Sequence, residues 1–174
     1  MPKIIENIRE KLLSEAREQL FSKGYSAVTV RSVAKACGVG VGTLYNYFPS
    51  KEILVASFML EDWKVFMGKA GEEVKALTSA SDVFRCVYLG LRAFTEKYER
   101  LFSDTAANRD RGTVGDNHRL LRSQISALIL PVCEKSGAEN VPFLTDFVSE
   151  ALITWTVEGR SFEEIDSMLC KLFN

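Results

Sequence analysis

Apolar residues recur at helical spacing along almost the whole chain. The first such stretch predicts a long amphipathic helix that ends at Gly24, where a helix stop favours a residue without a Cβ atom. Its apolar positions are Ile5, Ile8, Leu12, Ala16 and Leu20. No segment shows a convincing strand pattern, and no repeat or low-complexity segment stands out. We therefore predict an all-α protein of about nine helices.

Five longer helical stretches follow the first third of the chain. They are predicted at 51–77, 84–102, 121–132, 142–155 and 162–173. Ser161 and Glu164 have the spacing of a capping box, which predicts where the last of these helices begins. The polar residues of 78–81 and the turn-rich stretch 108–115 are predicted to be connections.

Between Thr29 and Phe48 the pattern predicts two short helices joined by a tight glycine turn. Thr29 is a good N-cap for the first helix, and Gly38 follows the last apolar position of that helix. Gly40 can serve as the next N-cap, and Leu44 and Phe48 then face inward. This leaves hydroxyl and phenol groups on the outer face of the second helix, a layout typical of a helix-turn-helix that reads DNA.

The residues of this segment resemble the tetracycline-repressor-like (TetR) family of transcriptional regulators. The resemblance rests on Thr29-Val-Arg31, Ala34, Gly38-Val39, Gly42-Thr43-Leu44-Tyr45, Tyr47-Phe48 and Pro49-Ser50-Lys51-Glu52, which match in register and without gaps. It covers about the first third of the chain. The family usually has Ser at the position of Gly40 and often a polar or basic residue at Val41.

The resemblance implies two functional parts. A three-helix DNA-binding domain is expected over residues 1–49, with its helix-turn-helix at about 29–48, and a helical ligand-binding and dimerisation domain over 50–174. The second short helix would enter the major groove of double-stranded, pseudo-palindromic operator DNA. The predicted DNA-binding residues are Thr29, Arg31, Val41, Gly42, Thr43, Tyr45, Tyr47 and Lys51.

Charge is distributed unevenly along the chain. Positions 1–51 hold eight basic and four acidic residues, whereas the whole chain has a formal net charge of −1. A basic N-terminal segment joined to an acidic remainder suits a protein whose first part meets phosphate groups. Without the motif, the same asymmetry could be a chance fluctuation of solvated charges.

Aromatic side chains in the middle helices allow two interpretations. They could form an ordinary core, or they could line a cavity that holds a small amphipathic inducer, with Arg92 or His118 at its flank. The resemblance favours the cavity. The predicted ligand-binding residues are Trp63, Phe66, Met67, Phe84, Tyr88, Phe94, Tyr98 and Phe102.

The last two helices are apolar on more than one face, which predicts that two copies of the chain associate. The resemblance implies a homodimer formed by a four-helix bundle. The alternative is that these residues complete the core of a single chain. The predicted interface residues are Phe147, Ala151, Trp155, Ile165, Met168 and Leu172.

Several classes of function find little support in the sequence. The four cysteines are far apart and His118 is the only histidine, so we expect no metal site. No nucleophile signature or nucleotide loop is present, so we expect neither an enzyme nor a cofactor. No apolar run approaches the roughly 18 residues of a membrane span, which predicts a cytoplasmic protein.

We therefore predict a DNA-binding transcriptional regulator, most simply a repressor that a small amphipathic ligand releases from its operator. The alternative is an all-α ligand-binding or protein-interaction module that does not bind DNA.

Overall fold

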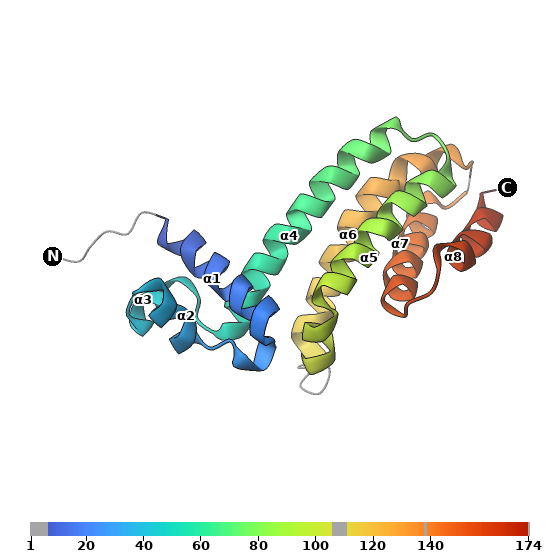
Figure 1. The fold of residues 1–174 in the computed structure, drawn as a ribbon. Helices are drawn as coiled ribbons and strands as arrows, with labels where there is room; N and C mark the ends of the chain where they lie inside the picture. Colours follow the sequence, from blue (N-terminus) through green and yellow to red (C-terminus); the bar gives the residue numbers. More distant parts are fainter. Residues whose placement is uncertain (1–6, 106–110, 138, 174) are drawn as a thin grey trace. The chain divides into compact units, whose positions relative to one another are not determined.

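The computed structural model describes residues 7–105, 111–137 and 139–173, and within these ranges the chain forms eight α-helices, three short 3₁₀ turns and no strand (Figure 1). The all-α prediction is confirmed. The chain divides into two compact units. The N-terminal unit holds the residues up to Trp63 together with Arg100–Ala107, and the C-terminal unit holds Lys64–Glu99 and Asn108–Asn174. The predicted functional boundary after position 49 falls at the start of α4, inside the N-terminal unit.

Three helices and the first part of a fourth build most of the N-terminal unit. They are α1 (Ile8–Lys23), α2 (Val30–Cys37), α3 (Val41–Tyr47) and the start of α4 (Lys51–Glu73). Gly24 ends α1 with a φ of 83°, a value that side chains with a Cβ atom rarely adopt, as the sequence predicted. A 3₁₀ turn (Tyr25–Ala27) then leads to α2.

Charged side chains of α1 hold α4 within this unit. Arg17 donates from Nη2 to the Asp62 carboxylate at 2.8 Å and to the Phe58 carbonyl at 3.3 Å. Arg9 forms a more exposed pair with Glu61 at 3.2 Å. Because the Asp62 side chain is only 16% exposed, its pair with Arg17 is less screened by water than the Arg9 pair.

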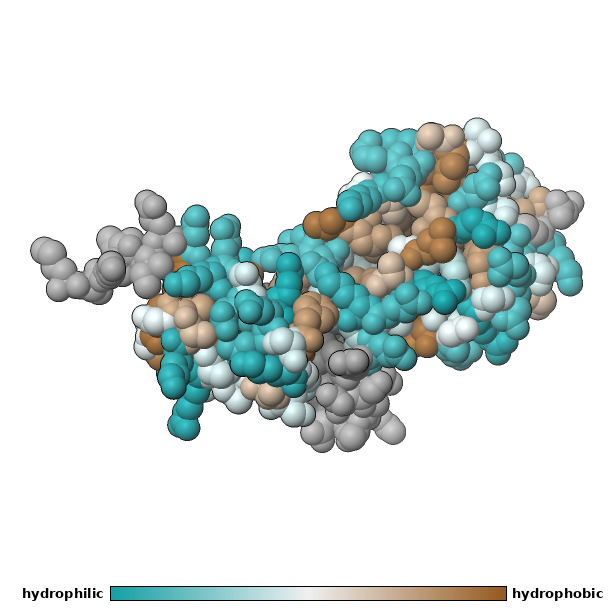
Figure 2. Space-filling model, viewed as in Figure 1, coloured by the Kyte–Doolittle hydropathy of each residue, from teal (hydrophilic) through white to brown (hydrophobic). Residues whose placement is uncertain are grey.

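The C-terminal unit contains the rest of α4 and four further helices. These are α5 (Ala80–Thr105), α6 (Arg111–Lys135), α7 (Val141–Val157) and α8 (Phe162–Leu169), and a 3₁₀ turn (Cys170–Leu172) follows α8. Helices α6 and α7 lie side by side (Figure 1) and are joined by hydrogen bonds from Ser126 Oγ to Asp146 at 3.1 Å and with Ser149 Oγ at 2.9 Å. The face of the molecule drawn in Figure 2 is mainly hydrophilic and carries scattered hydrophobic patches.

Helix α4 continues into the C-terminal unit, where the Phe66 ring lies directly over Gly90 of α5. A Cβ atom built on Gly90 would stand 1.9 Å from Cε2 of that ring. Only the missing side chain of glycine allows this close approach. The contact therefore fixes how the end of α4 packs on α5.

The main departure from the predicted elements is at the start of α6. The turn-rich stretch 108–115 was predicted to be a connection, but α6 begins at Arg111, so residues 111–115 are helical, while 108–110 lie outside the described residues. A glycine inside a helix costs only about 1 kcal/mol, and extending an existing helix adds one backbone bond per residue. The long helix that follows therefore outweighs the local preference for a turn.

The other helix ends lie closer to the positions predicted from the sequence. Helix α4 stops at Glu73, and a 3₁₀ turn (Val74–Ala76) covers the last positions of the predicted stretch. The capping box at the start of α8 is present, because the Ser161 backbone N–H donates to the Glu164 carboxylate at 2.9 Å and the Glu164 N–H donates to Ser161 Oγ at 3.3 Å.

Candidate functional site

The start of α2 is fixed by a reciprocal pair of hydrogen bonds. The Ser32 backbone N–H donates to Thr29 Oγ1 at 2.9 Å, and the Thr29 N–H donates to Ser32 Oγ at 3.1 Å. The sequence predicted Thr29 as the cap, whereas the return bond from Ser32 was not foreseen. A serine three residues after the cap can replace the usual Glu or Gln of a capping box.

Ser32 also ties α2 to α1. Its hydroxyl donates to Gln19 Oε1 at 2.6 Å, and Gln19 Nε2 donates in turn to Glu15 at 2.7 Å. Gln19, in the middle of this link, is 5% exposed, and Ser32 and Glu15 at its two ends are partly exposed. A bridge of this kind holds α2 at a fixed position on α1 and with it the turn that follows.

A glycine in the left-handed conformation makes the turn between α2 and α3. Gly38 has a φ of 70°, and its N–H and the next one bond back to Lys35 and Ala34. Helix α3 then starts at Val41 with Gly40 as an N-cap that has no side chain. The two predicted inward residues are buried, with Leu44 at 0% and Phe48 at 2% exposure.

The opposite face of α3 lies open to solvent. Tyr45 and Tyr47 are 49% and 44% exposed, Gly42 and Thr43 are exposed, and Val41 is partly covered. Arg31, on the preceding helix α2, is also exposed and carries a positive charge. The structure thus leaves phenol and hydroxyl groups outward without a role in the core, as a DNA-reading face requires.

Lys51 and Thr29 have partners within the protein. The Lys51 ammonium donates to the Tyr25 carbonyl and lies 3.8 Å from the centre of the Tyr25 ring. Burial lowers the pKa of Lys51, an effect that the Glu52 carboxylate opposes. Thr29 contributes its hydroxyl to the cap of α2. Contacts of either residue with phosphate stay predictions.

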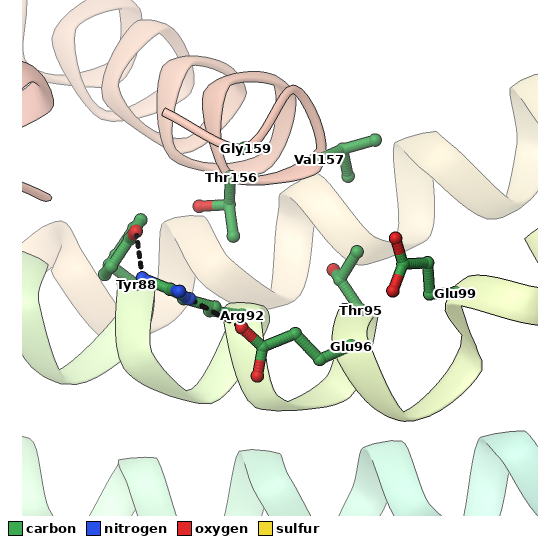
Figure 3. Close-up of a pocket in the computed structure, with 8 residues that line it drawn as sticks. All are labelled: Tyr88, Arg92, Thr95, Glu96, Glu99, Thr156, Val157 and Gly159. Atoms are coloured by element: carbon green, nitrogen blue, oxygen red, sulfur yellow. Dashed lines mark hydrogen bonds and ion pairs between the residues drawn. The ribbon is translucent and has the colours of Figure 1, made fainter. Parts of the chain in front are cut away.

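A pocket opens in the C-terminal unit between α5 and the end of α7 (Figure 3). Its volume is about 270 Å³. Its walls are formed by Tyr88, Arg92, Thr95, Glu96 and Glu99 of α5 and by Thr156, Val157 and Gly159. More than half of these side chains are polar or charged. The aromatic cavity expected from the sequence stays a prediction.

Only Tyr88 of the predicted ligand-binding residues lines this pocket. Phe84 and Tyr98 are buried in the C-terminal unit, and Trp63 is buried in the N-terminal unit. The partly covered ones are Phe66, Met67 and Phe94. The Phe102 side chain lies outside what the structure describes.

Polar groups on the pocket floor form a chain of hydrogen bonds. Arg92 donates from Nε to Glu96 at 2.7 Å and from Nη1 to the Tyr88 hydroxyl at 3.4 Å. That hydroxyl donates to the Arg160 carbonyl at 2.9 Å, which holds the turn before α8 on α5. The i,i+4 spacing of Arg92 and Glu96 could have indicated their pairing from the sequence.

The residues predicted at a dimer interface fall into two groups. Phe147, Met168 and Leu172 are 46%, 56% and 44% exposed. Ala151 and Ile165 are buried within the single chain, and Trp155 is partly covered. Helical periodicity marks both groups alike, because it does not tell which neighbour covers a face.

The structure adds one exposed aromatic residue to this surface. Phe143 is 68% exposed and stacks on Phe147, with ring centres 6.4 Å apart. Its i,i+4 spacing from Phe147 was visible in the sequence.

Three further observations concern the part of the chain that the structure describes. They contain no group of three or more His, Cys, Asp or Glu side chains that could hold a metal ion. The only histidine of the sequence, His118, lies 3.5 Å from the Glu150 carboxylate. None of the described helices is long and apolar enough to cross a membrane.

Comparison with known proteins agrees with this geometry. Residues 12–58, which run from α1 to the start of α4, match the family model described as "Bacterial regulatory proteins, tetR family". UidR of Escherichia coli K12, an HTH-type transcriptional regulator, is 29% identical over 69 residues, which are 40% of this chain and 35% of UidR. The chain thus spans about a third of the length of this relative.

A longer match extends beyond the N-terminal unit. YhgD of Bacillus subtilis 168, described as an uncharacterized HTH-type transcriptional regulator, is 31% identical over 149 residues, which cover 80% of this chain and 78% of YhgD. The fold is similar to that of Thermus thermophilus FadR, a TetR-family repressor solved with lauroyl-CoA, with a TM-score of 0.65, 19% identity and coverage of 95% and 92% of the two chains. With the helix-turn-helix geometry and these matches, the chain belongs to the tetR family of bacterial regulatory proteins.

Proposed function

We propose that the protein is a sequence-specific DNA-binding transcriptional regulator, a repressor that leaves its operator when a small molecule binds. The observation that carries this proposal is the exposed face of α3, where Thr43, Tyr45 and Tyr47 are open to solvent while Leu44 anchors the helix from within. Family membership supports it independently.

The structure favours different roles for the proposed DNA contacts. Arg31 is charged and exposed, so it can pair with a phosphate or with a guanine edge. Thr43, Tyr45 and Tyr47 can donate hydroxyl hydrogens to phosphates or bases. Lys51 would have to leave Tyr25 to reach DNA, so we rank it below these four residues.

Salt-dependent binding to a palindromic duplex from the neighbouring promoter tests this proposal. Arg31→Ala should weaken binding and reduce the slope of log K against log salt by about 1 if Arg31 meets a phosphate. Tyr47→Phe should weaken binding to all sequences alike if the Tyr47 hydroxyl donates to a phosphate, because phosphate contacts carry no sequence information. Lys69→Ala is the matched control, since Lys69 is an exposed cation of the C-terminal unit. Unchanged affinity in folded Arg31 and Tyr47 variants would overturn the assignment.

The second part of the proposal is a homodimer that uses exposed apolar residues of α7, of α8 and of the 3₁₀ turn that follows α8. Four large apolar side chains are exposed to solvent in the single chain, which is typical of a surface that binds a partner. They are Phe143, Phe147, Met168 and Leu172. Two copies related by a two-fold axis would place two α3 helices on successive major grooves, about 34–36 Å apart. Phe147→Glu should then yield a monomer by light scattering and weaken operator binding. A wild-type protein that is monomeric and still binds the operator would refute the dimer.

A further inference from the structure

Asn46 is an exposed residue in the second half of α3 whose amide has no evident role in the fold. No hydrogen bond joins this amide to another described residue. By contrast, the side chain of Asn140 caps α7, because its oxygen accepts from the Phe143 N–H at 3.2 Å. Asparagine is also among the less favourable residues inside a helix. Neither the core nor a helix cap therefore accounts for an amide at position 46.

The rotation of α3 places Asn46 at the middle of the open face of this helix. Each residue of an α-helix is turned by about 100° from the one before it, so residues four apart share a face. Leu44 and Phe48 are such a pair, and because both are buried they mark the inner side of the helix. Asn46 lies midway between them in the sequence and hence about 180° from the centre of the inner side. Its position on the helix is therefore the one farthest from the core.

The two tyrosines of α3 lie on either side of Asn46. By the same rotation, Tyr45 and Tyr47 are each about 80° from the centre of the inner side, in opposite directions. Their nearly equal exposed fractions, 49% and 44%, agree with this symmetry. Helix α3 in the major groove would thus extend one tyrosine toward each phosphate backbone, and Asn46 would face the base edges between them.

Gly42 leaves space beside Asn46. It precedes Asn46 by four residues, so both lie on the open face of α3. A Cβ atom on Gly42 would meet nothing within 4 Å, and its φ is not positive, so neither a protein contact nor the backbone conformation requires glycine there. The missing side chain allows a base to approach the backbone of α3 one turn before the Asn46 amide.

The amide of asparagine matches one base in the major groove. It offers one oxygen acceptor and an NH₂ donor, and adenine presents the N6 amino donor and the N7 acceptor side by side, so both hydrogen bonds can form at once. Guanine presents two acceptors there, which suit a cation such as Arg31 instead. The chemistry of this side chain therefore favours an A·T pair in a fixed orientation.

We propose that Asn46 is a base-reading residue of α3 and selects one adenine in each half of the operator through N6 and N7. Tyr45 and Tyr47 hold the helix to the phosphates on the two sides of that base. This inference rests on the proposed function, because it names a base contact of the same site. Sequence reasoning missed Asn46, although the expected burial of Leu44 and Phe48 already placed it on the opposite side of the helix.

Selection of duplexes from a random pool by the full chain identifies the preferred operator and the adenines to test. Each adenine is then replaced, one position at a time in both halves, by 7-deazaadenine, which carries a C–H group in place of N7 and still pairs with thymine. At one position the unmodified chain should bind about two- to twelvefold more weakly for each adenine replaced, because one hydrogen bond is lost. Exchange of that A·T pair for G·C should weaken binding about 5–150-fold.

Asn46→Ala connects this effect to the residue. The variant should bind the preferred operator more weakly, and 7-deazaadenine at the sensitive position should then have no further effect, because the partner of N7 is gone. Its stability to urea should be equal or higher, since alanine favours a helix more than asparagine does. Measurement at low salt keeps the weaker complexes within range.

Ser123→Ala is the matched control, because Ser123 is an exposed, neutral, polar residue of α6 in the C-terminal unit. This variant should keep both the affinity and the sensitivity to 7-deazaadenine of the unmodified chain. The adenines of the operator at which 7-deazaadenine has no effect serve as the control on the DNA.

Three results would overturn the role of Asn46. They are an operator in which every adenine tolerates 7-deazaadenine, an Asn46→Ala variant that keeps the full sensitivity, and a loss of affinity that is equal for the preferred operator and an unrelated duplex. The last result would place the amide on a phosphate. Each of them leaves the proposed function standing, whereas failure of the chain to bind any duplex of the pool refutes that function and the base contact with it.

Discussion

Replacing Gly90 by alanine tests whether the Phe66 ring packs directly against Gly90 of α5. A Cβ atom at position 90 would lie 1.9, 2.5 and 2.8 Å from three carbons of the Phe66 ring, well inside contact distance. Overpacking of this kind costs about 1–3 kcal/mol, because the ring must leave its favoured position. The better helix propensity of alanine offsets about 1 kcal/mol of that cost. We expect Gly90→Ala to lower the free energy of unfolding by up to about 2 kcal/mol.

Gly68→Ala provides the matched control. Gly68 lies inside α4, and a Cβ atom there would meet nothing within 4 Å. The same substitution should therefore stabilise the chain by about 1 kcal/mol. The two variants should differ by about 1–3 kcal/mol, which corresponds to roughly 2–12 °C in Tm for a chain of this size.

Urea unfolding followed by circular dichroism at one fixed protein concentration measures this difference, since association with a second copy would shift the midpoints. Phe66→Leu in the Gly90→Ala background should cost less than the sum of the two single changes, because the smaller side chain makes room for the new methyl group. A Gly90→Ala variant as stable as Gly68→Ala would refute the contact.

Three further changes have expected outcomes. Gly40→Ser should stabilise the chain by a few tenths of a kcal/mol in thermal unfolding, because a hydroxyl can cap α3 where a Cβ atom meets only Thr43 Oγ1 at 3.9 Å; destabilisation would show that the site lacks room. Burial and the Glu73 carboxylate raise the pKa of Cys86 to about 11, so iodoacetamide should alkylate this thiol slowly at pH 8 and faster after Glu73→Gln; equal rates would contradict the pKa shift. Ser32→Ala should cost about 1–2 kcal/mol in urea unfolding, since it removes half of the capping box and a part-buried hydrogen bond to Gln19; a cost near zero would count against that network.

The helix-turn-helix was predictable because its determinants are local. Thr29 caps α2 through an atom three residues away, and Gly38 is the kind of residue that a left-handed turn demands. The burial of Leu44 and Phe48 follows from their spacing on one short helix. Each of these features depends on residues close together in the sequence.

The pocket was not predictable in the same way. Glu96 and Glu99 look like solvent-exposed positions of an amphipathic helix, and nothing in the sequence brings them near Thr156, which lies more than fifty positions away. The buried Ile165 and the exposed Phe147 were equally apolar candidates for an interface. Only the packing of distant helices decides such cases, and periodicity describes one helix at a time.

The ion pairs between α1 and α4 determine where this chain can be cut to build a chimeric regulator. A transplant of residues 1–49 onto a different sensing domain would separate Arg9 and Arg17 from Glu61 and Asp62 and leave two cations of α1 facing foreign residues. A transplant that continues through Trp63 would take both carboxylates and the Phe58 carbonyl with it. The two sequences of such a hybrid should therefore be joined within α4 after Trp63, so that the residues of α4 that contact Arg9 and Arg17 stay with the helix-turn-helix.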